Sequence, residues 1–199
     1  MSAKFSKKPP WGNKKIIPVD VTGISVCPPY QGYVVILQEK QGMERRLPIF
    51  IGVAEAQAIS ILLQKLEYAR PLTFDLFGNM LQEIDASVKS ITVTELKDNT
   101  FYAIIELVDG NGITHYIDAR PSDSIALALK TKAPIFVAEK IMDNASLHPD
   151  QMPESEIDQI AALNQKLQEA VADEAYEEAA KIRDKIRELE QKIGGHNKV

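Results

Sequence analysis

Two short helical segments that are apolar on nearly every side constrain what this chain can fold into. The first runs from about Val53 to Leu66, and its apolar side chains encircle the predicted helix instead of forming one stripe. The second follows Pro121 and reads SIALALK. A helix without a polar face has to be covered on more than one side. The sequence therefore predicts that other elements pack around both helices.

An internal repeat relates the two helices. Residues 57–64 (QAISILLQ) align with residues 123–130 (DSIALALK), and each helix follows about three strand-like runs. Two β-β-β-α units can stack their sheets on either side of a shared layer of helices, which accounts for the missing polar faces. We therefore predict an α+β fold with duplicated β-β-β-α units in a three-layer β/α/β arrangement. Short apolar helices also occur in ordinary α/β cores, and this alternative stays open.

The two ends of the chain differ from its centre. Residues 1–14 combine lysines and prolines with isolated Phe5 and Trp11, a composition typical of a flexible basic arm. Residues 15–145 hold the predicted domain, in which Asp-Gly and Asn-Gly pairs between strand runs indicate a hairpin. Residues 146–156 contain two prolines and no apolar periodicity, and we interpret them as a linker.

The predicted C-terminal region is an α-helical hairpin. Residues 157–193 contain two amphipathic helices with a short turn, and residues 194–199 form a tail. A hairpin of this size is too small to be stable on its own core. We therefore expect it to pair with a partner protein or with a second copy of the chain, which makes a homo-oligomer the expected state.

Composition excludes several classes of protein. The net charge is −5, and the five lysines of residues 1–18 are not followed by a broadly basic domain. The electrostatic signature of a dedicated duplex-binding protein is therefore missing. No apolar run approaches the ~20 residues of a membrane helix, no signal-like segment follows the first lysines, and Cys27 is the only cysteine. We expect a cytoplasmic protein without membrane contact.

Carboxylates at the strand-to-helix junctions form the best candidate site. Asp118 and Arg120 share one strand face by the period of two, and Asp123 at the helix start can turn toward the same edge. If the repeat holds, Glu55 and Gln57 occupy the equivalent junction. Clustered carboxylates bind Mg²⁺ or Mn²⁺, and a cation stabilises the charge that develops in phosphodiester hydrolysis. Alternatively, Asp123 caps its helix and Asp118 pairs with Arg120.

The remaining candidates are weaker. Arg70 and Asp75 can contact a substrate, or they are a surface ion pair at a helix start. His115, His148 and His196 lie on a predicted strand, in the linker and in the tail, so a histidine-based site cannot be assembled from them. Signatures of dinucleotide, NTPase, zinc-protease and serine-hydrolase sites are absent from the sequence.

Two family resemblances appear at these residues. The blocks LPIFIGVAEAQAI, RPLTFDLF, DNTFYAIIEL and IDARPSDSIALALKTKAPIFVAE, within residues 19–145, resemble the bifunctional nuclease domain family. This resemblance implies a duplicated β-β-β-α fold in three layers. The segment YEEAAKIRDKIREL is similar to the UVR motif of bacterial excision-repair nuclease subunits, which implies a helical hairpin for protein–protein contact.

The first resemblance implies a nuclease that hydrolyses RNA and/or DNA with a divalent metal. Under this hypothesis Asp118, Asp123 and Glu55 bind Mg²⁺ or Mn²⁺, and Arg120 neutralises the transition state. The substrate-binding residues would be Arg70, Asp75 and Gln57. The alternative hypothesis is a non-enzymatic regulatory module that binds a ligand or partner at the Asp118 to Asp123 corner and is recruited through its UVR-type hairpin.

Overall fold

The structure is a computed structural model of the whole chain. It describes residues 9–12, 14–26, 32–148, 163, 166–167, 170 and 175–195. The chain divides into two compact units, Met1–Gln151 and Met152–Val199. Most of the first helix of the predicted hairpin and most of the predicted linker lie outside the described residues.

Six strands of the first unit form two antiparallel meanders. Their bounds are β1 Ile16–Val26, β2 Tyr33–Glu39 and β3 Arg46–Ile51, then β4 Ser87–Lys97, β5 Thr100–Val108 and β6 Thr114–Ala119. A seventh strand, β7 (Ile135–Ala138), pairs antiparallel with β1 and parallel with β4. The result is one seven-stranded sheet in the order β3-β2-β1-β7-β4-β5-β6. The predicted α+β class is confirmed.

The short strand β7 lies in the middle of the sheet because it is apolar on both faces. It reads IFVA, and three of its four side chains are buried. Such a continuous apolar run is typical of a strand that is covered on both sides. Val137 pairs with Ile17 on one side and with Val93 on the other. Both meanders therefore belong to one hydrogen-bonded sheet.

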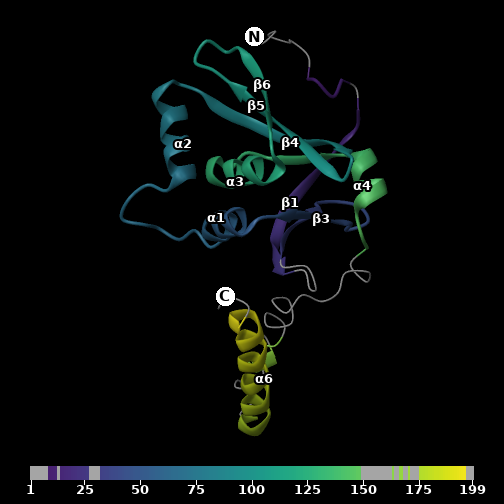
Figure 1. Cartoon of the computed structure of the whole chain (residues 1–199), viewed down its shortest axis with the longest axis vertical. Helices are drawn as coiled ribbons and strands as arrows, with labels where there is room; N and C mark the ends of the chain where they lie inside the picture. The colour runs from purple at the N-terminus through teal and green to yellow at the C-terminus, as the bar shows by residue number, and fades with distance from the viewer. Residues whose placement is uncertain are drawn as a thin grey trace. The chain divides into compact units, whose positions relative to one another are not determined.

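Four helices complete this unit, and two of them lie between the halves of the sheet (Figure 1). Their bounds are α1 Val53–Leu63, α2 Thr73–Glu83, α3 Pro121–Thr131 and α4 Glu139–Ala145. Helix α1 packs on β1 and β2, α3 packs on β4 and β5, and α1 and α3 contact each other. Most of α3 is buried, as its sequence predicts, whereas α1 buries only Ala56 and Ile59. The exposed side of α1 faces a groove.

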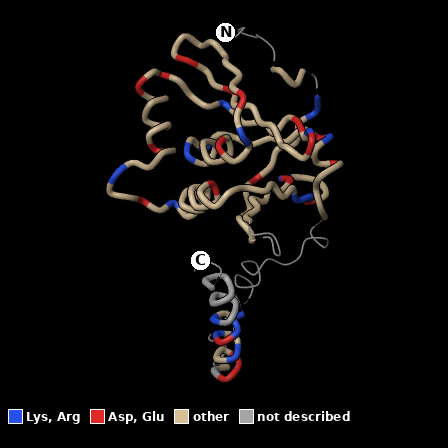
Figure 2. The backbone as a smooth tube through the Cα atoms, in the orientation of Figure 1, with Lys and Arg blue, Asp and Glu red and all other residues tan. Residues whose placement is uncertain are grey.

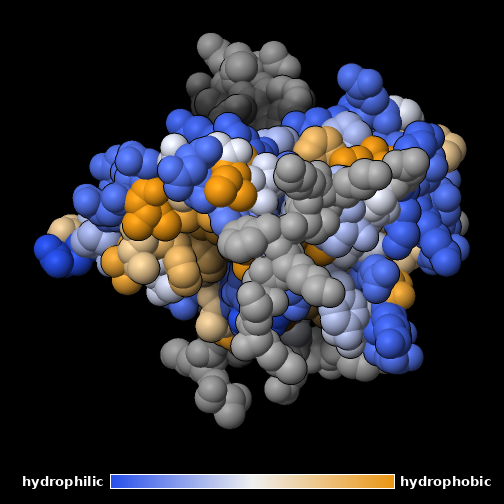
Figure 3. All heavy atoms as spheres, turned by 90° about the horizontal axis from the view of Figure 1, so that it is seen from above, coloured by the Kyte–Doolittle hydropathy of each residue, from blue (hydrophilic) through white to orange (hydrophobic). Residues whose placement is uncertain are grey.

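Helix α2 has the predicted amphipathic pattern, but its apolar side chains are not buried. It packs on α3, and Leu76, Phe77 and Met80 are each about half exposed. Apolar side chains also gather on this side of the molecule in a space-filling view (Figure 3). The helix therefore contributes few apolar contacts to the core, and ion pairing becomes important for its position.

One residue of the predicted flexible arm is buried. Trp11 is 9% exposed, and its ring meets Tyr116 of β6 edge-on with the ring centroids 5.6 Å apart. This burial could not be predicted from the sequence, because Tyr116 lies far from Trp11 along the chain. The described part of the arm thus packs against the sheet through an aromatic contact.

The described part of the C-terminal unit contains α6, Tyr176–Gly195. Two residues at the predicted apolar positions of this helix, Ala179 and Ile186, are buried. Residues 163, 166–167 and 170 are helical, but the predicted hairpin as a whole remains a prediction. No helix among the described residues is long and apolar enough to cross a membrane.

A buried ion pair holds the turn between β2 and β3. The Arg45 Nε and Nη2 atoms lie 3.0 and 3.1 Å from the two carboxylate oxygens of Glu39, and Nη1 lies 2.7 Å from Asp143 Oδ1 on α4. The Arg45 and Glu39 side chains are only 10% and 8% exposed. The hydrogen bond from Arg45 lowers the pKa of Glu39 below its usual value of 4.5. One guanidinium thus connects the first meander to α4.

We expect Arg45→Ala to lower the free energy of unfolding by about 3 kcal/mol, because it leaves the Glu39 carboxylate buried without its partner. The neighbouring Arg46 is more exposed and hydrogen-bonds Gln38, so Arg46→Ala is a matched control that should cost less than about 1 kcal/mol. Urea unfolding followed by the fluorescence of Trp11, the only tryptophan, measures both. Equal losses in the two variants would contradict the role of the buried pair.

Candidate active site

A groove of about 1220 Å³ opens along α1, α2 and α3, and we call it the α1–α3 groove. Four of the predicted site residues line it: Glu55, Gln57, Asp75 and Asp123. Glu55 lies in the first turn of α1 and Asp123 in the first turn of α3. Because these two helices contact each other, carboxylates from the two halves of the domain lie close together.

Arg120 connects these two carboxylates. Its Nη1 atom lies 3.0 Å from Glu55 Oε1, its Nε atom lies 2.7 Å from Asp123 Oδ2, and its Nη2 atom lies 3.1 Å from Asp123 Oδ1. The hydrogen bonds that Arg120 donates to Asp123, and then the one to Glu55, raise the pKa of Arg120. The arginine side chain is 67% exposed, so the Glu55–Arg120–Asp123 cluster is accessible to a ligand.

The local sequence explains the position of Arg120. A residue before proline avoids the helical region, and Arg120 has extended backbone angles (φ −68°, ψ 144°) directly before Pro121, the first residue of α3. Its carbonyl oxygen accepts a hydrogen bond of 2.7 Å from Ser124 Oγ, which holds the corner. The N-cap residue of α3 is Arg120, whereas Asp123 lies inside the first turn of the helix. Its carboxylate binds Arg120 instead, so the predicted capping role is wrong.

The lack of a side chain at Gly52 leaves space for the Glu55 carboxylate. This glycine precedes α1, and a Cβ atom added to it would lie 2.4 Å from Glu55 Oε2. The backbone angles of Gly52 (φ −76°, ψ 170°) are open to any residue, so the constraint is the close approach of the carboxylate. The role of this glycine was not predicted, although the sequence places it directly before the helix turn that carries Glu55.

Two of the predicted residues lie outside the cluster. Asp118 is exposed on β6, where its backbone pairs with Ile104. Among the described residues, no hydrogen bond or ion pair joins the Asp118 side chain to Arg120, so the predicted local pair is not formed. Arg70 is exposed and is not one of the residues that line the groove.

Asp75 pairs with Lys130, which was not among the predicted site residues. Its carboxylate forms an ion pair with Lys130 in the last turn of α3 and accepts a hydrogen bond of 2.8 Å from the Leu72 backbone N–H. Lys130, as the larger cause, and this backbone contact lower the pKa of Asp75. The expected pair with Arg70 is therefore replaced by one that joins α2 to α3 along the groove. The only signal for Lys130 was its place at the end of an apolar helix.

The converging carboxylates do not form the expected metal-ligand set. Within the residues that the structure describes, no group of three or more His, Cys, Asp or Glu side chains could hold a metal ion. Both Glu55 and Asp123 bind the Arg120 guanidinium, and Asp118 does not join them. As arranged, the cluster is one cation between two anions.

Fold and site together define an α+β domain with a charged groove at the starts of two packed helices, followed by a separate helical unit. The bifunctional nuclease domain model matches residues 35–150, and the UvrB/uvrC motif matches residues 158–192. An uncharacterized protein of Mycobacterium tuberculosis is 40% identical over 137 residues, which cover 68% of this chain and 80% of that protein. The chain therefore belongs to the bifunctional nuclease domain family.

More distant relatives come from plants. Bifunctional nuclease 1 of Oryza sativa subsp. japonica is 23% identical over 179 residues, which cover 77% of this chain and 54% of that protein. Bifunctional nuclease 2 of Arabidopsis thaliana is 24% identical over 184 residues, which cover 79% of this chain and 56% of that protein. The chain thus spans about half the length of these plant proteins.

Proposed function

We propose that this protein hydrolyses phosphodiester bonds of RNA or DNA in the α1–α3 groove, with the Glu55–Arg120–Asp123 cluster as its catalytic centre. The observation that carries the proposal is the exposed Arg120 guanidinium, which carboxylates from two different helices hold at an open groove. Family membership and the names of the plant relatives support the same reaction.

Each member of the cluster has a separate role in this proposal. Three hydrogen-bonded contacts orient Arg120 before a substrate arrives, so its charge can stabilise the negative charge that develops on the phosphate oxygens. Asp123 orients the guanidinium through two of them. Glu55 is bound through Oε1, and its carboxylate accepts the proton of the attacking water as the new P–O bond forms and the bond to the leaving oxygen breaks.

Substrate contacts come from the rest of the groove. Gln57 lines it near Glu55 and offers an amide for hydrogen bonds, while Asp75 acts indirectly by holding Lys130. Arg120 belongs to the site through its contacts with Glu55 and Asp123, which line the groove. Arg70 and Asp118 have no role in this proposal because neither lines the groove and, among the described residues, no ion pair joins either of them to the cluster. A role for Mg²⁺ or Mn²⁺ stays a prediction from the family resemblance, since the carboxylates as arranged bind Arg120.

The charge of the groove favours a few local contacts over a broad nucleic-acid interface. Its lining holds four acidic residues and three lysines: Glu55, Glu67, Asp75, Asp123, Lys65, Lys130 and Lys132. Basic and acidic residues are scattered over the described backbone of the domain, and the basic ones are not gathered on one side of it (Figure 2). We therefore propose a single-stranded segment as the substrate, because a duplex normally requires a wide basic surface.

The domain's two halves are proposed to be copies of one β-β-β-α unit, in the predicted three-layer arrangement. Three antiparallel strands precede α1 in one half and α3 in the other, and both helices lie between the halves of the sheet (Figure 1). Under this proposal, Glu55 and Asp123 come from equivalent junctions, and the catalytic centre is assembled at the contact between the two copies.

A non-enzymatic binding module is the second candidate. The observation that favours it is that the charges of the cluster already satisfy one another, as they do in a purely structural ion pair. In that case the groove would bind a ligand without cleaving it, and wild-type protein would show no more hydrolysis than a variant that lacks Arg120. The assay for the first proposal therefore separates the two.

We expect Arg120→Gln to reduce cleavage of single-stranded RNA and DNA oligonucleotides about 100-fold, because it removes an oriented charge from the transition state. Arg46→Gln, which removes the same charge outside the groove, should leave the rate unchanged. Each protein is assayed with Mg²⁺, with Mn²⁺ and with EDTA, which also tests the predicted metal dependence. Equal rates in wild type and Arg120→Gln under all conditions would refute the proposal.

Gly52→Ala tests the position of Glu55 without changing any charge. The added methyl group overlaps the carboxylate, which must move away from Arg120, so we expect the cleavage rate to fall about tenfold. The displaced atoms are the end of a flexible side chain, so the free energy of unfolding should change by less than about 1 kcal/mol. Gly23→Ala, where the new Cβ meets nothing within 4 Å, is the matched control. An unchanged rate in Gly52→Ala would remove Glu55 from the mechanism.

The C-terminal unit is proposed to contact a partner protein or a second copy of the chain. Support comes from the motif match at residues 158–192. If it pairs copies, light scattering should give at least a dimer mass for the full chain and a monomer mass for a chain ending at His148. We choose this end because the Leu147 backbone still pairs with Arg46 of β3. Equal association states would exclude self-pairing through this unit.

A further inference from the structure

We propose that a second pocket, distinct from the α1–α3 groove, binds a nucleoside phosphate. This pocket of about 570 Å³ lies between the start of β1, the end of β4 and helix α4. Four lysines belong to its lining, Lys14, Lys15, Lys97 and Lys140, and we call it the lysine pocket. No residue lines both the lysine pocket and the groove.

The lysine pocket is locally positive in a protein of net charge −5. Its lining holds only two carboxylates, and each already has a lysine partner: Lys14 Nζ lies 3.6 Å from Glu95 Oε1, and Lys15 pairs with Glu139. In the described part of the chain no carboxylate pairs with Lys97 or Lys140. Two positive charges therefore remain in excess, which favours an anionic ligand.

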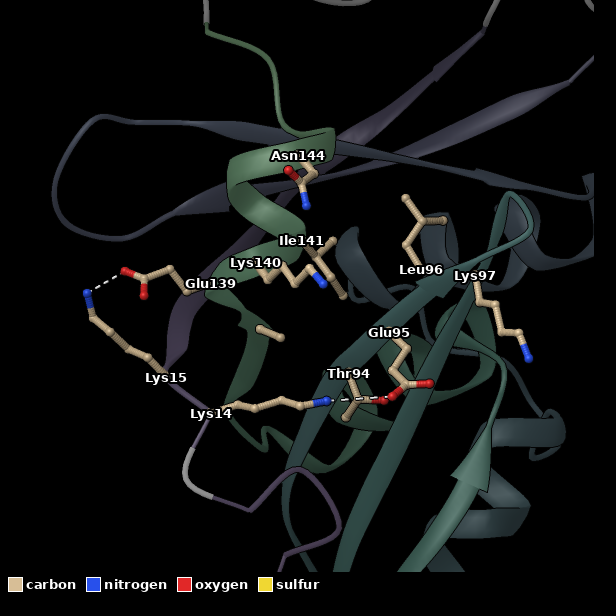
Figure 4. Close-up of a pocket in the computed structure, with 11 residues that line it drawn as sticks. Lys14, Lys15, Thr94, Glu95, Leu96, Lys97, Glu139, Lys140, Ile141 and Asn144 are labelled. Carbon is tan, nitrogen blue, oxygen red and sulfur yellow. Dashed lines mark hydrogen bonds and ion pairs between the residues drawn. The ribbon is translucent and has the colours of Figure 1, made fainter.

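The side chains converge on the space between α4 and β4. The close-up shows Lys14 extending toward β4, Lys140 extending from α4 into the same space, and the amide of Asn144 turned toward it (Figure 4). Lys15 and Lys97 lie at the margins and point outward (Figure 4). Lys140, which has no carboxylate partner among the described residues, and Lys14, which would exchange its 3.6 Å ion pair with Glu95 for the ligand, are thus the cations placed to contact a bound group.

The walls between these polar groups are apolar. Leu96, which is 40% exposed, and the buried residues Ala138 and Ile141 line the pocket together with the lysine stems. Apolar walls with a few polar groups, in a volume of roughly 300–1,000 Å³, are the usual features of a small-molecule site. A free inorganic anion would leave such walls uncovered, whereas the flat face of a nucleobase would cover them.

These features select a nucleoside phosphate. Lysine ammonium groups bind phosphate as point charges, and Lys14 and Lys140 would hold it. The base would lie against Leu96 and Ile141, and the Asn144 amide, with both donor and acceptor atoms, would bond its edge. The same chemistry is present in a free nucleotide and in one nucleotide of a single strand. The ligand of the lysine pocket is therefore either a free nucleotide or one nucleotide of a single strand.

The test uses the full-length protein and two probes, AMP and a short single-stranded phosphorothioate thymidylate that resists hydrolysis. Binding of AMP is followed by the backbone amide resonances of residues 94–97 and 138–144, and binding of the strand by fluorescence anisotropy. The variant is Lys14→Gln with Lys140→Gln. The control is Lys89→Gln with Lys185→Gln, which removes the same charge at exposed positions outside the pocket.

We expect the pocket variant to bind its ligand about tenfold more weakly than the control variant. A loss of AMP affinity, with shifts at the pocket amides, identifies a free-nucleotide site. A loss confined to the strand identifies a site for one nucleotide of a longer chain. Equal affinities in the two variants, shifts confined to the groove residues, or no binding of either probe would overturn the proposal. Each comparison is between the pocket variant and the control variant and uses probes that are not cleaved, so its outcome does not depend on catalysis in the groove.

Discussion

The pairing of β7 with two strands from different parts of the chain determines how the two meanders and their helices are arranged in the first unit. Because β7 bonds to β1 on one side and to β4 on the other, the two meanders form one sheet and their following helices face each other. The contact between α1 and α3 then brings Glu55 to Arg120 and Asp123. Without this strand the two halves would have no shared sheet, and the cluster would not be assembled.

Local signals were sufficient to predict the α+β class, the burial of α3 and the junctions that carry Glu55 and Asp123. The predicted covering of α1 on more than one side was wrong, because only Ala56 and Ile59 of that helix are buried. The correct predictions rest on residues a few positions apart, such as Pro121 at the first position of α3. The central place of β7 could not be predicted, because a four-residue apolar run does not specify its partners. The contact of Trp11 with Tyr116 and the burial of Arg45 were missed for the same reason, since each needs a distant partner.

The carboxylate that binds Arg120 could not be predicted from the sequence. Strand alternation places Asp118 on the same face as Arg120, and helix geometry places Asp123 near it, so both carboxylates were reasonable partners. The conformation of the corner decides between them: with Arg120 extended before Pro121, its side chain reaches back over the first turn of α3. Glu55 then binds the remaining side of the guanidinium, an interaction that depends on tertiary structure.

Charge separates the two candidate binding regions of the domain. In the α1–α3 groove the acidic and basic side chains nearly balance, and the strongest contacts are among the residues themselves. Such a site favours a reaction in which negative charge develops in the transition state, because the oriented charged side chains need little rearrangement to stabilise it. The lysine pocket has an unbalanced positive charge and apolar walls, which favour stable binding of an anion. Under the two proposals, a single chain would hold a nucleotide in the lysine pocket and act on a phosphodiester in the α1–α3 groove.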